Sequence, residues 1–288
     1  MSLKNRASIP SNPQQARFGF SIVVFMLLAG SVRADEMIYP LGAAVAKDGS
    51  VFVVDLKMHG VWKIVDGELS PFFKGSKKFR TPLNAARCIT IDNAGKILVG
   101  DTSTREIYRF DDDGKPQPVI KTKTGIGTPM GMAVAKDGTI FVSDLEVRRI
   151  WKVSPKGGEP EEFAAVPASR GMTFDSDGNL YVVSVSKDHS LIRLTPDAKV
   201  EIVVKGRPFK FPHDVVLDKD KNAYVSDGWG KCVWKVTPDG ESKKWATHDS
   251  FRNPVGLAWR GDDLLIIDPQ AKAVFQADRE GSVTSLLN

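Results

Sequence analysis

Short apolar segments alternate with polar turn residues along most of the chain, and the clearest example lies between Phe211 and Val236. This stretch contains three strand-like segments separated by turns, at residues 215–218, 223–226 and 232–236. A fourth apolar segment closes each unit, as at residues 201–204 and 283–287. The pattern therefore predicts a unit of four short strands.

The unit recurs six times at a nearly constant spacing. With Asp214 as the reference position, the equivalent residues are Gly42, Cys88, Gly131, Gly171, Asp214 and Gly256. Successive reference positions are 46, 43, 40, 43 and 42 residues apart. Four-stranded units with a period of about 40–45 residues are typical of β-propeller blades. The sequence predicts an all-β fold, a six-bladed β-propeller of four-stranded antiparallel blades, at about 40–79, 80–127, 128–166, 167–209, 210–251 and 252–288.

Two further positions repeat within the unit. Seven residues after the reference position a glycine closes the first turn, where positive φ is needed, at Gly49, Gly95, Gly138 and Gly178. In the fifth unit Lys221 stands there, and we expect Asn222 to take that conformation. An acidic residue ends the second strand in five units, at Asp55, Asp101, Asp144, Asp227 and Asp268. Because a carboxylate there can accept N–H bonds from the following loop, we interpret Asp55, Asp144 and Asp268 as structural.

The order of these positions, P-x-G, D-x-x-G, V-x-D and R-I-x-K, resembles the NHL repeat over about residues 39–288. The resemblance implies a closed ring of blades and carries little information about activity. Since the last blade supplies its own fourth strand, we expect the ring to close by packing of blade 6 against blade 1. An added strand from residues 36–39 is the alternative.

The first 34 residues do not follow the repeat. Lys4, Arg6 and Arg17 precede an apolar run at residues 18–30, and small residues around Ala34 suit cleavage. This order is typical of a secretory signal peptide, so we expect a secreted or periplasmic protein with residues 35–288 as one propeller domain. The run is short for a membrane span, and we expect no stable membrane span after processing; a retained anchor is the alternative.

The net charge of the chain after cleavage gives no indication of a nucleic-acid partner. Cleavage leaves 36 basic and 35 acidic residues, a net charge of +1. One short basic cluster, at residues 74–80, is interpreted as a solvated loop, so no nucleic-acid partner is predicted.

Cys88 and Cys232 belong to blades on opposite sides of the ring, too far apart for a disulfide. We therefore expect two free thiols.

One residue per blade precedes the reference position and should face the central channel: Leu41, Arg87, Met130, Arg170, His213 and Val255. Two converging guanidinium groups favour a small anionic molecule such as a carboxylate, a phosphate or a sugar acid. The alternative is that each arginine pairs with a rim acid such as Asp101 or Asp214. His213 is the candidate catalytic base and metal ligand, and a neutral imidazole bonded to Asp214 or Asp227 is the alternative.

Further candidates lie near the same face. Asp101, Asp214, Asp227 and Trp229 are candidate ligand-binding residues, and Trp229, in a Gly-Trp-Gly loop outside the repeat, is a candidate floor of a ligand pocket. The other three histidines, His59, His189 and His248, are expected on this face but farther from the axis. A divalent metal remains open, because catalytic zinc needs about three protein ligands and only His213 is placed at the opening.

Two enzyme families share parts of this pattern. Asp92-Asn93-Ala94-Gly95-Lys96 is similar to the six-bladed SMP-30/gluconolactonase-type lactonases, which implies a divalent metal held by Glu, Asn and Asp at the channel. The throat positions here offer Leu41 and Arg87 instead.

The second resemblance lies in blade 5. Pro212-His213-Asp214, followed by Ser226-Asp227-Gly228-Trp229, resembles the peptide-amidating lyases, which implies histidine-bound zinc with a tyrosine and an arginine. Only His213 matches, since Trp229 stands where a tyrosine is expected.

These observations predict an exported propeller that binds a small anionic ligand at its channel through Arg87 and Arg170. Lactonase, hydrolase or lyase chemistry would use His213 to move a proton. The alternative is a non-catalytic scaffold whose rim loops bind a protein or a polysaccharide.

Overall fold

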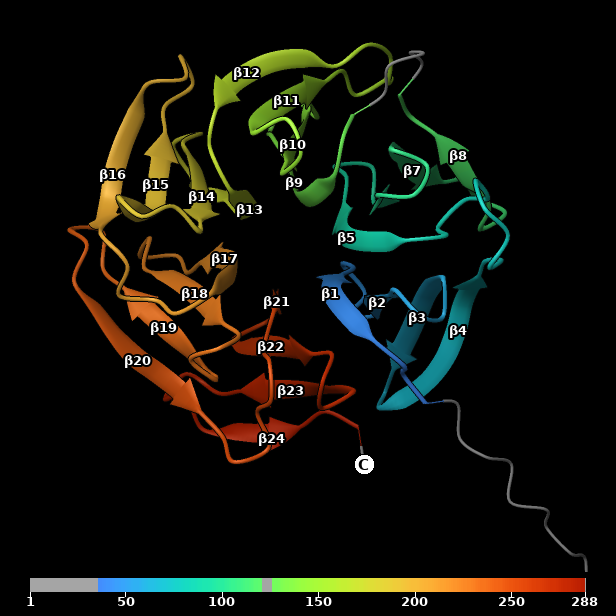
Figure 1. Cartoon of the computed structure of the whole chain (residues 1–288). Coiled ribbons are helices and arrows are strands. Elements are labelled where there is room, and N and C mark those ends of the chain that lie inside the picture. Colours follow the sequence, from blue (N-terminus) through green and yellow to red (C-terminus); the bar gives the residue numbers. More distant parts are fainter. Residues whose placement is uncertain (1–35, 121–125, 288) are drawn as a thin grey trace, which may run out of the picture. The chain divides into compact units, whose positions relative to one another are not determined.

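The computed structural model describes residues 36–120 and 126–287, which form six four-stranded antiparallel sheets arranged around a central channel (Figure 1). The predicted six-bladed all-β fold is confirmed. The predicted signal peptide, residues 1–34, lies outside the described residues. Among the described residues, none forms a helix long and apolar enough to cross a membrane.

Each sheet is built from four consecutive strands. The innermost strands are β1 (Pro40–Val45), β5 (Ala86–Ile91), β9 (Pro129–Val134), β13 (Ser169–Phe174), β17 (Pro212–Leu217) and β21 (Gly256–Arg260). The second strands are β2 (Val51–Asp55), β6 (Ile97–Asp101), β10 (Ile140–Asp144), β14 (Leu180–Ser184), β18 (Ala223–Asp227) and β22 (Asp263–Asp268). The third strands are β3 (Gly60–Val65), β7 (Glu106–Phe110), β11 (Arg149–Val153), β15 (His189–Leu194), β19 (Cys232–Val236) and β23 (Ala273–Ala277). The outermost strands are β4 (Glu68–Lys74), β8 (Pro116–Pro118), β12 (Glu161–Ala165), β16 (Val200–Lys205), β20 (Ser242–Thr247) and β24 (Val283–Ser285).

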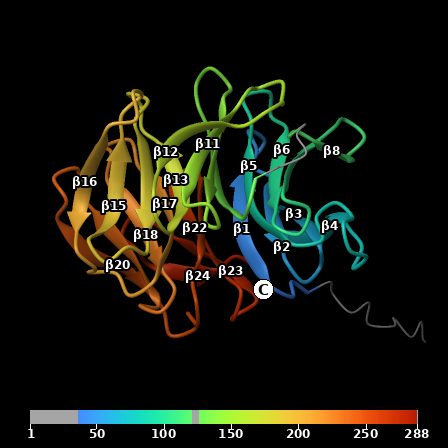
Figure 2. The same cartoon turned by 45° about the horizontal axis from the view of Figure 1, so that its top comes forward.

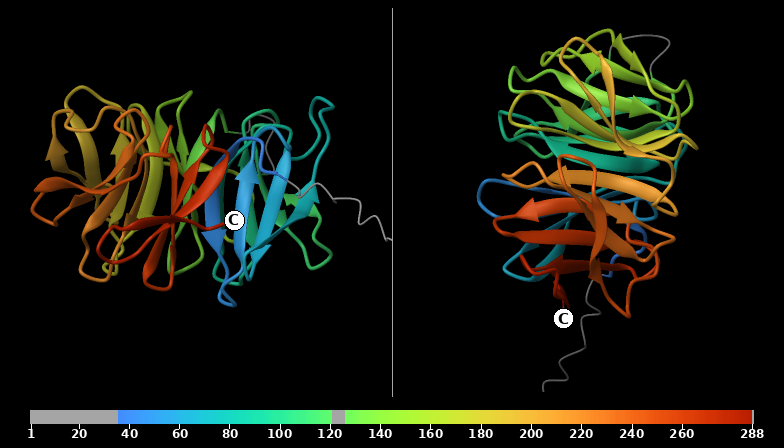
Figure 3. Two further views of the ribbon diagram at one scale, coloured as in Figure 1. Left: turned by 90° about the horizontal axis from the view of Figure 1, so that it is seen from below. Right: turned by 90° about the vertical axis from the view of Figure 1, so that its left-hand side faces the viewer.

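The strands of each blade run between the two faces of the ring, so loops lie on both faces (Figure 2, Figure 3). The second strand is buried along its whole length in β2, β6, β10, β14 and β18. Neighbouring blades cover both of its faces, which explains why a run such as Val51-Phe52-Val53-Val54 is continuously apolar.

The first turn of each blade follows the predicted conformation with one correction. Gly49, Gly95, Gly138 and Gly178 have φ between 81° and 88°. In the fifth blade Lys221 itself adopts φ of 62°, not Asn222 as expected. The hydrogen bond from the Lys221 N–H to the Asp218 carbonyl (3.1 Å) closes the same turn as in the other blades, so the backbone requirement prevails over side-chain preference.

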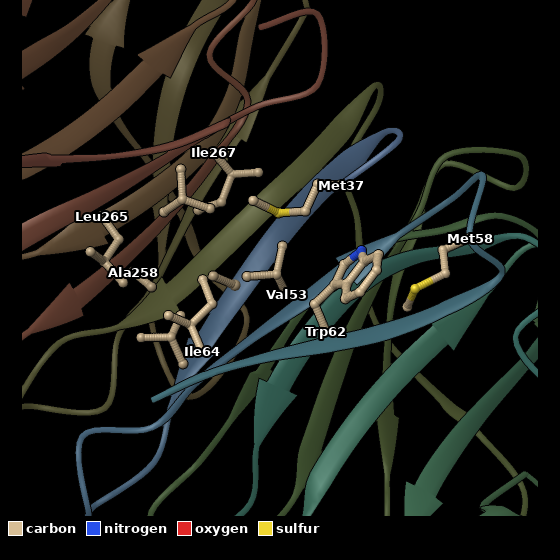
Figure 4. Close-up of a cluster of buried hydrophobic side chains, with 11 residues drawn as sticks. Met37, Val53, Met58, Trp62, Ile64, Ala258, Leu265 and Ile267 are labelled. Atoms are coloured by element: carbon tan, nitrogen blue, oxygen red, sulfur yellow. The ribbon is translucent and has the colours of Figure 1, made fainter. Parts of the chain in front are cut away.

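Blade 6 packs directly on blade 1 and closes the ring (Figure 4). Met37, Val53 and Trp62 of the first blade belong to the same buried hydrophobic cluster as Ala258 and Ile267 of the last. The last sheet contains only β21 to β24, and residues 36–39 add no strand to it. The prediction of closure by packing is therefore confirmed.

The glycines at the reference position allow the innermost strands to approach closely. A Cβ atom on Gly131 would lie 2.5 Å from the Arg170 carbonyl oxygen, and one on Gly256 would lie 2.6 Å from the Leu41 carbonyl oxygen. A side chain at either place would push neighbouring blades apart. Cys88 and Cys232 are both buried and unbonded, as predicted.

The acids at the ends of the second strands tie each blade together. The Asp144 carboxylate accepts hydrogen bonds from the backbone N–H groups of Gly127 (2.6 Å) and Thr128 (2.9 Å) and from Trp151 Nε1 (3.0 Å). Asp55 and Asp268 also accept backbone N–H groups from both the preceding and the following segments. All three have a structural role, and it extends beyond the following loop to the segment that enters the blade.

Candidate functional site

β-Bulges at the start of the innermost strands set which side chains reach the channel. In blade 2 the pairing passes from Ala86↔Asp101 to Cys88↔Gly100, which leaves Arg87 without a partner residue. In blade 4 it passes from Ser169↔Ser184 to Met172↔Val182, and in blade 5 from Pro212↔Asp227 to Val215↔Val225. Arg170, His213 and Asp214 lie in these gaps. Bulges re-aim side chains in this way at the rims of β-structures.

The central channel encloses about 530 Å³. Its lining includes all six residues expected at the opening: Leu41, Arg87, Met130, Arg170, His213 and Val255. Asp214 also lines it, whereas Asp101, Asp227 and Trp229 do not. The structure thus brings four of the seven candidate site residues together in one cavity.

The two channel arginines form no ion pair with any acid in the part of the chain that the structure describes. Within residues 36–120 and 126–287 no carboxylate forms an ion pair with Arg87 or Arg170, so neither Asp101 nor Asp214 takes the role considered from the sequence. The buried Nε atom of each arginine lacks a hydrogen-bond partner among the described residues. Burial, and secondly the nearby Arg87 charge, lower the pKa of Arg170. Two such cations beside a cavity attract an anion.

His213 is held as a neutral imidazole. Burial, and secondly the Arg170 charge, lower the pKa of His213 to about 3, while Asp227 acts weakly in the opposite direction. Its ring packs edge-on against Phe211, with ring centroids 4.9 Å apart. Among the described residues no hydrogen bond links His213 to Asp214 or Asp227. The ring is therefore unprotonated at neutral pH, with no hydrogen bond to either acid.

Asp214 is a channel acid whose oxygens are already engaged. They accept the backbone N–H groups of Val215 (2.9 Å) and, in the next blade, Leu257 (3.0 Å). Burial raises the pKa of Asp214 to about 6 despite these bonds. Burial likewise raises the pKa of the neighbouring Cys88 thiol to about 12, which leaves this thiol inert at neutral pH.

The candidates outside the channel have other environments. The Asp101 carboxylate accepts the N–H groups of Asn84 and Ala85 (both 3.0 Å). The Asp227 carboxylate accepts those of Lys210 and Phe211 (both 2.8 Å). Both acids are fully buried and hold backbone in place. Trp229 lies on the surface, where it stacks on Phe211.

The remaining histidines do not reach the channel lining. His59 Nδ1 lies 2.5 Å from the Asn84 carbonyl oxygen, His189 begins β15, and His248 packs against Phe251 and Phe275. In the described part of the chain no three His, Cys, Asp or Glu side chains gather closely enough to hold a metal ion.

The Glu, Asn and Asp ligand set implied by the lactonase resemblance is not assembled here. Among the described residues, the channel lining holds Asn93, Asn253 and Asp214 but no glutamate. The Asn93 amide group donates to the carbonyl oxygens of Ala135 and Lys136 (both 3.0 Å). These residues do not fit such a metal.

The structure adds Asn253 and Phe211 to the site. A Cβ atom on Gly228 would lie 2.2 Å from Asn253 Oδ1 and 3.1 Å from His213 Nε2, so the asparagine and the histidine approach the same glycine. Two features of the sequence could have indicated these residues: an Asn-Pro pair before the innermost strand of the last blade, and an aromatic residue before Pro212-His213.

Known proteins are similar to this chain in sequence. Virginiamycin B lyase of Nocardia farcinica is 25% identical over 196 residues, which cover 68% of this chain and 67% of that protein. Peptidyl-glycine alpha-amidating monooxygenase B of Xenopus laevis is 23% identical over 228 residues, 69% of this chain. The match covers only 26% of the length of that larger protein.

Solved structures show the same fold at low sequence identity. A gluconolactonase of Xanthomonas campestris has a TM-score of 0.73 at 16% identity, covering 88% of both chains. A catalytically inactive histidine-to-alanine variant of virginiamycin B lyase from Staphylococcus aureus, in complex with quinupristin, has a TM-score of 0.66 at 18% identity, covering 87% of this chain and 85% of that one. The SMP-30/Gluconolactonase/LRE-like region matches residues 21–210, well over half of the sequence. The chain therefore belongs to the SMP-30/gluconolactonase/LRE-like family.

Proposed function

We propose that this protein binds a small carboxylate at the opening of its central channel and cleaves it as a lyase, with His213 as the base. The observation that carries this proposal is the pairing of two guanidinium groups that have no acidic partner among the described residues with a neutral imidazole in the same cavity. Membership of a family with lactonases, and similarity to a lyase, support hydrolase or lyase chemistry.

The arginines would orient the substrate and stabilise charge. A carboxylate or carbonyl oxygen between Arg87 and Arg170 gains negative charge when the adjacent carbon loses a proton, and fixed cations stabilise that charge without reorganisation. Because the two arginines already repel each other, an anion between them also relieves an unfavourable arrangement in the free protein.

His213 would take the proton. The electron pair of the C–H bond forms a carbon–carbon double bond, and the neighbouring C–O bond breaks with its electron pair leaving on oxygen. Burial, and secondly the Arg170 charge, lower the pKa of His213 in the free protein. A bound carboxylate offsets that charge, so the imidazole becomes a stronger base when substrate is present.

Binding is tested by calorimetric titration of the wild type, Arg87→Gln and Arg170→Gln with small carboxylates. We expect each substitution to weaken binding about tenfold or more, since a charge-assisted hydrogen bond is lost. Arg105→Gln is the matched control, because Arg105 is exposed and pairs with Glu146. Unchanged binding by Arg170→Gln would contradict the proposal.

Chemistry is tested with gluconolactone and quinupristin as ester substrates. Elimination leaves a double bond in the product, whereas hydrolysis adds one water, and mass spectrometry distinguishes them. We expect His213→Gln to bind carboxylates but to lose turnover. Turnover that survives this substitution would remove His213 from the mechanism. Carboxylate binding without turnover of any ester would favour a binding scaffold.

We also propose export of the protein with cleavage after Ala34, on the basis of the charged, apolar and small residues at the N-terminus. N-terminal sequencing of the protein from its native host tests this directly. A mature chain that still contains residues 1–34 would contradict it.

A further inference from the structure

An aromatic shelf, defined here as Phe211 and Trp229, connects the rim of the ring with the channel. The two rings stack with centroids 4.6 Å apart and an interplanar angle of 18°. The Arg170 guanidinium carbon lies 4.7 Å from the Phe211 centroid. Arg170 lines the channel, while 66% of the Trp229 surface remains exposed. The shelf therefore extends from a channel arginine to open solvent.

The loop that carries Trp229 is closely constrained. A Cβ atom on Gly228 would lie 2.2 Å from Asn253 Oδ1, and one on Gly230 would lie 2.4 Å from Asp227 Oδ2. Hydrogen bonds from the Gly228 N–H to the Phe211 carbonyl (3.1 Å) and from the Gly230 N–H to Asp227 Oδ1 (2.9 Å) complete the turn. A large indole is thus presented on a fixed support with most of its surface unpartnered, an arrangement that suits a flat ligand.

The opening of the channel is apolar at its other three positions, Leu41, Met130 and Val255. A ligand rich in hydroxyl groups would leave some of them without hydrogen-bond partners against this wall, which is unfavourable. A ligand with an apolar body and one anionic group matches both the wall and the arginines.

We propose that the substrate class is a carboxylate that carries an aromatic ring, with the carboxylate at Arg170 and the ring on Trp229. The contacts of 4.7 Å and 4.6 Å through Phe211 place the indole within about 9 Å of the guanidinium carbon, a span that one small molecule bridges. This inference rests on the proposed anion site and adds the selectivity of that site.

The test compares two ligands that differ only in the ring. N-benzoylglycine and N-acetylglycine share the carboxylate and the amide but carry phenyl and methyl groups. In calorimetric titrations of the full mature chain, we expect N-benzoylglycine to bind about three- to tenfold more tightly, the range for one aromatic stack. Trp229→Ala should remove this preference, whereas Trp229→Phe should retain it.

The outcomes separate the shelf from the anion site. Equal affinity of the wild type for both ligands, or a preference that persists in Trp229→Ala, would refute binding of the ring by the aromatic shelf. Neither result would contradict the proposed anion site at the arginines. Binding of both ligands that is unaffected by Arg170→Gln would instead overturn the anion site. Tighter binding of glucuronate than of N-benzoylglycine would replace the aromatic class with sugar acids.

Discussion

Replacing His213 with glutamine should make the protein less sensitive to acid. In the unfolded chain this histidine has its ordinary pKa of 6.5, and in the folded protein burial and Arg170 lower the pKa to about 3. Between these values the unfolded state binds more protons than the folded state, so the free energy of unfolding falls as pH falls. Below about pH 3 the histidine makes no further contribution to this dependence.

The size of the effect follows from the two pKa values. At pH 4 nearly every unfolded molecule is protonated at His213 and nearly every folded molecule is not. The wild type should therefore lose roughly 3 kcal/mol of stability from this residue between pH 7 and pH 4. Asp214, whose pKa is raised to about 6, contributes in the opposite direction but is present in both proteins, so its effect cancels in the comparison.

The assay is urea unfolding at pH 7 and pH 4, followed by circular dichroism, for the wild type, His213→Gln and the control His248→Gln. His248 packs at the edge of blade 6, away from the channel lining. Any packing defect of His213→Gln lowers the free energy of unfolding at both pH values, so it cancels when the values at pH 7 and pH 4 are subtracted. An equal loss of stability on acidification in the wild type and His213→Gln would refute the view that the folded protein holds this imidazole neutral.

Three other predictions concern acidic residues and cysteines of the blades. The Asp214 carboxyl takes up a proton as pH falls through about 6 and then no longer repels an anion. The affinity of the wild type for carboxylates, measured by calorimetry, should therefore rise between pH 7 and pH 5. The same rise in Asp214→Asn would contradict this role. Asp144→Asn should lower the free energy of unfolding by roughly 2–4 kcal/mol in urea titrations, because the buried acceptor of Gly127, Thr128 and Trp151 is impaired, while carboxylate affinity stays unchanged. Cys88 and Cys232, buried with pKa values raised to about 12 and about 11, should not react with a thiol reagent until the protein is unfolded; fast labelling of the native protein would show that a thiol is accessible.

The repeat made the fold predictable, because six registers impose the same turn and strand positions. The positions of the channel residues followed from the same register, as Leu41, Arg87 and Val255 illustrate. The roles of the acidic residues near the rim were harder to predict from the sequence. Asp101 and Asp227 occupy the same repeat position as Asp144 and, like it, bind backbone N–H groups, so their place in the repeat was a better guide than their nearness to the rim.

Two features of the site depend on three-dimensional detail that no sequence pattern states. The bulges that free Arg170 and His213 from strand pairing depend on hydrogen-bond register. The approach of Asn253 to Gly228 joins residues from two blades whose separation depends on how the sheets pack. The contact of Phe211 with Trp229 likewise required the loop conformation, because the sequence shows only an unusual Gly-Trp-Gly segment.

The seam between the last and first blades differs from the other five boundaries in the ring. At those five the polypeptide itself passes from one sheet to the next, whereas the seam is held by apolar burial between β1, β2 and β3 on one side and β21, β22 and β23 on the other. If the ring expands to admit a bulky guest, this joint offers no covalent resistance. Leu41 and Val255 flank this seam at the channel, whereas Arg170 and His213 lie on neighbouring blades that the polypeptide itself connects.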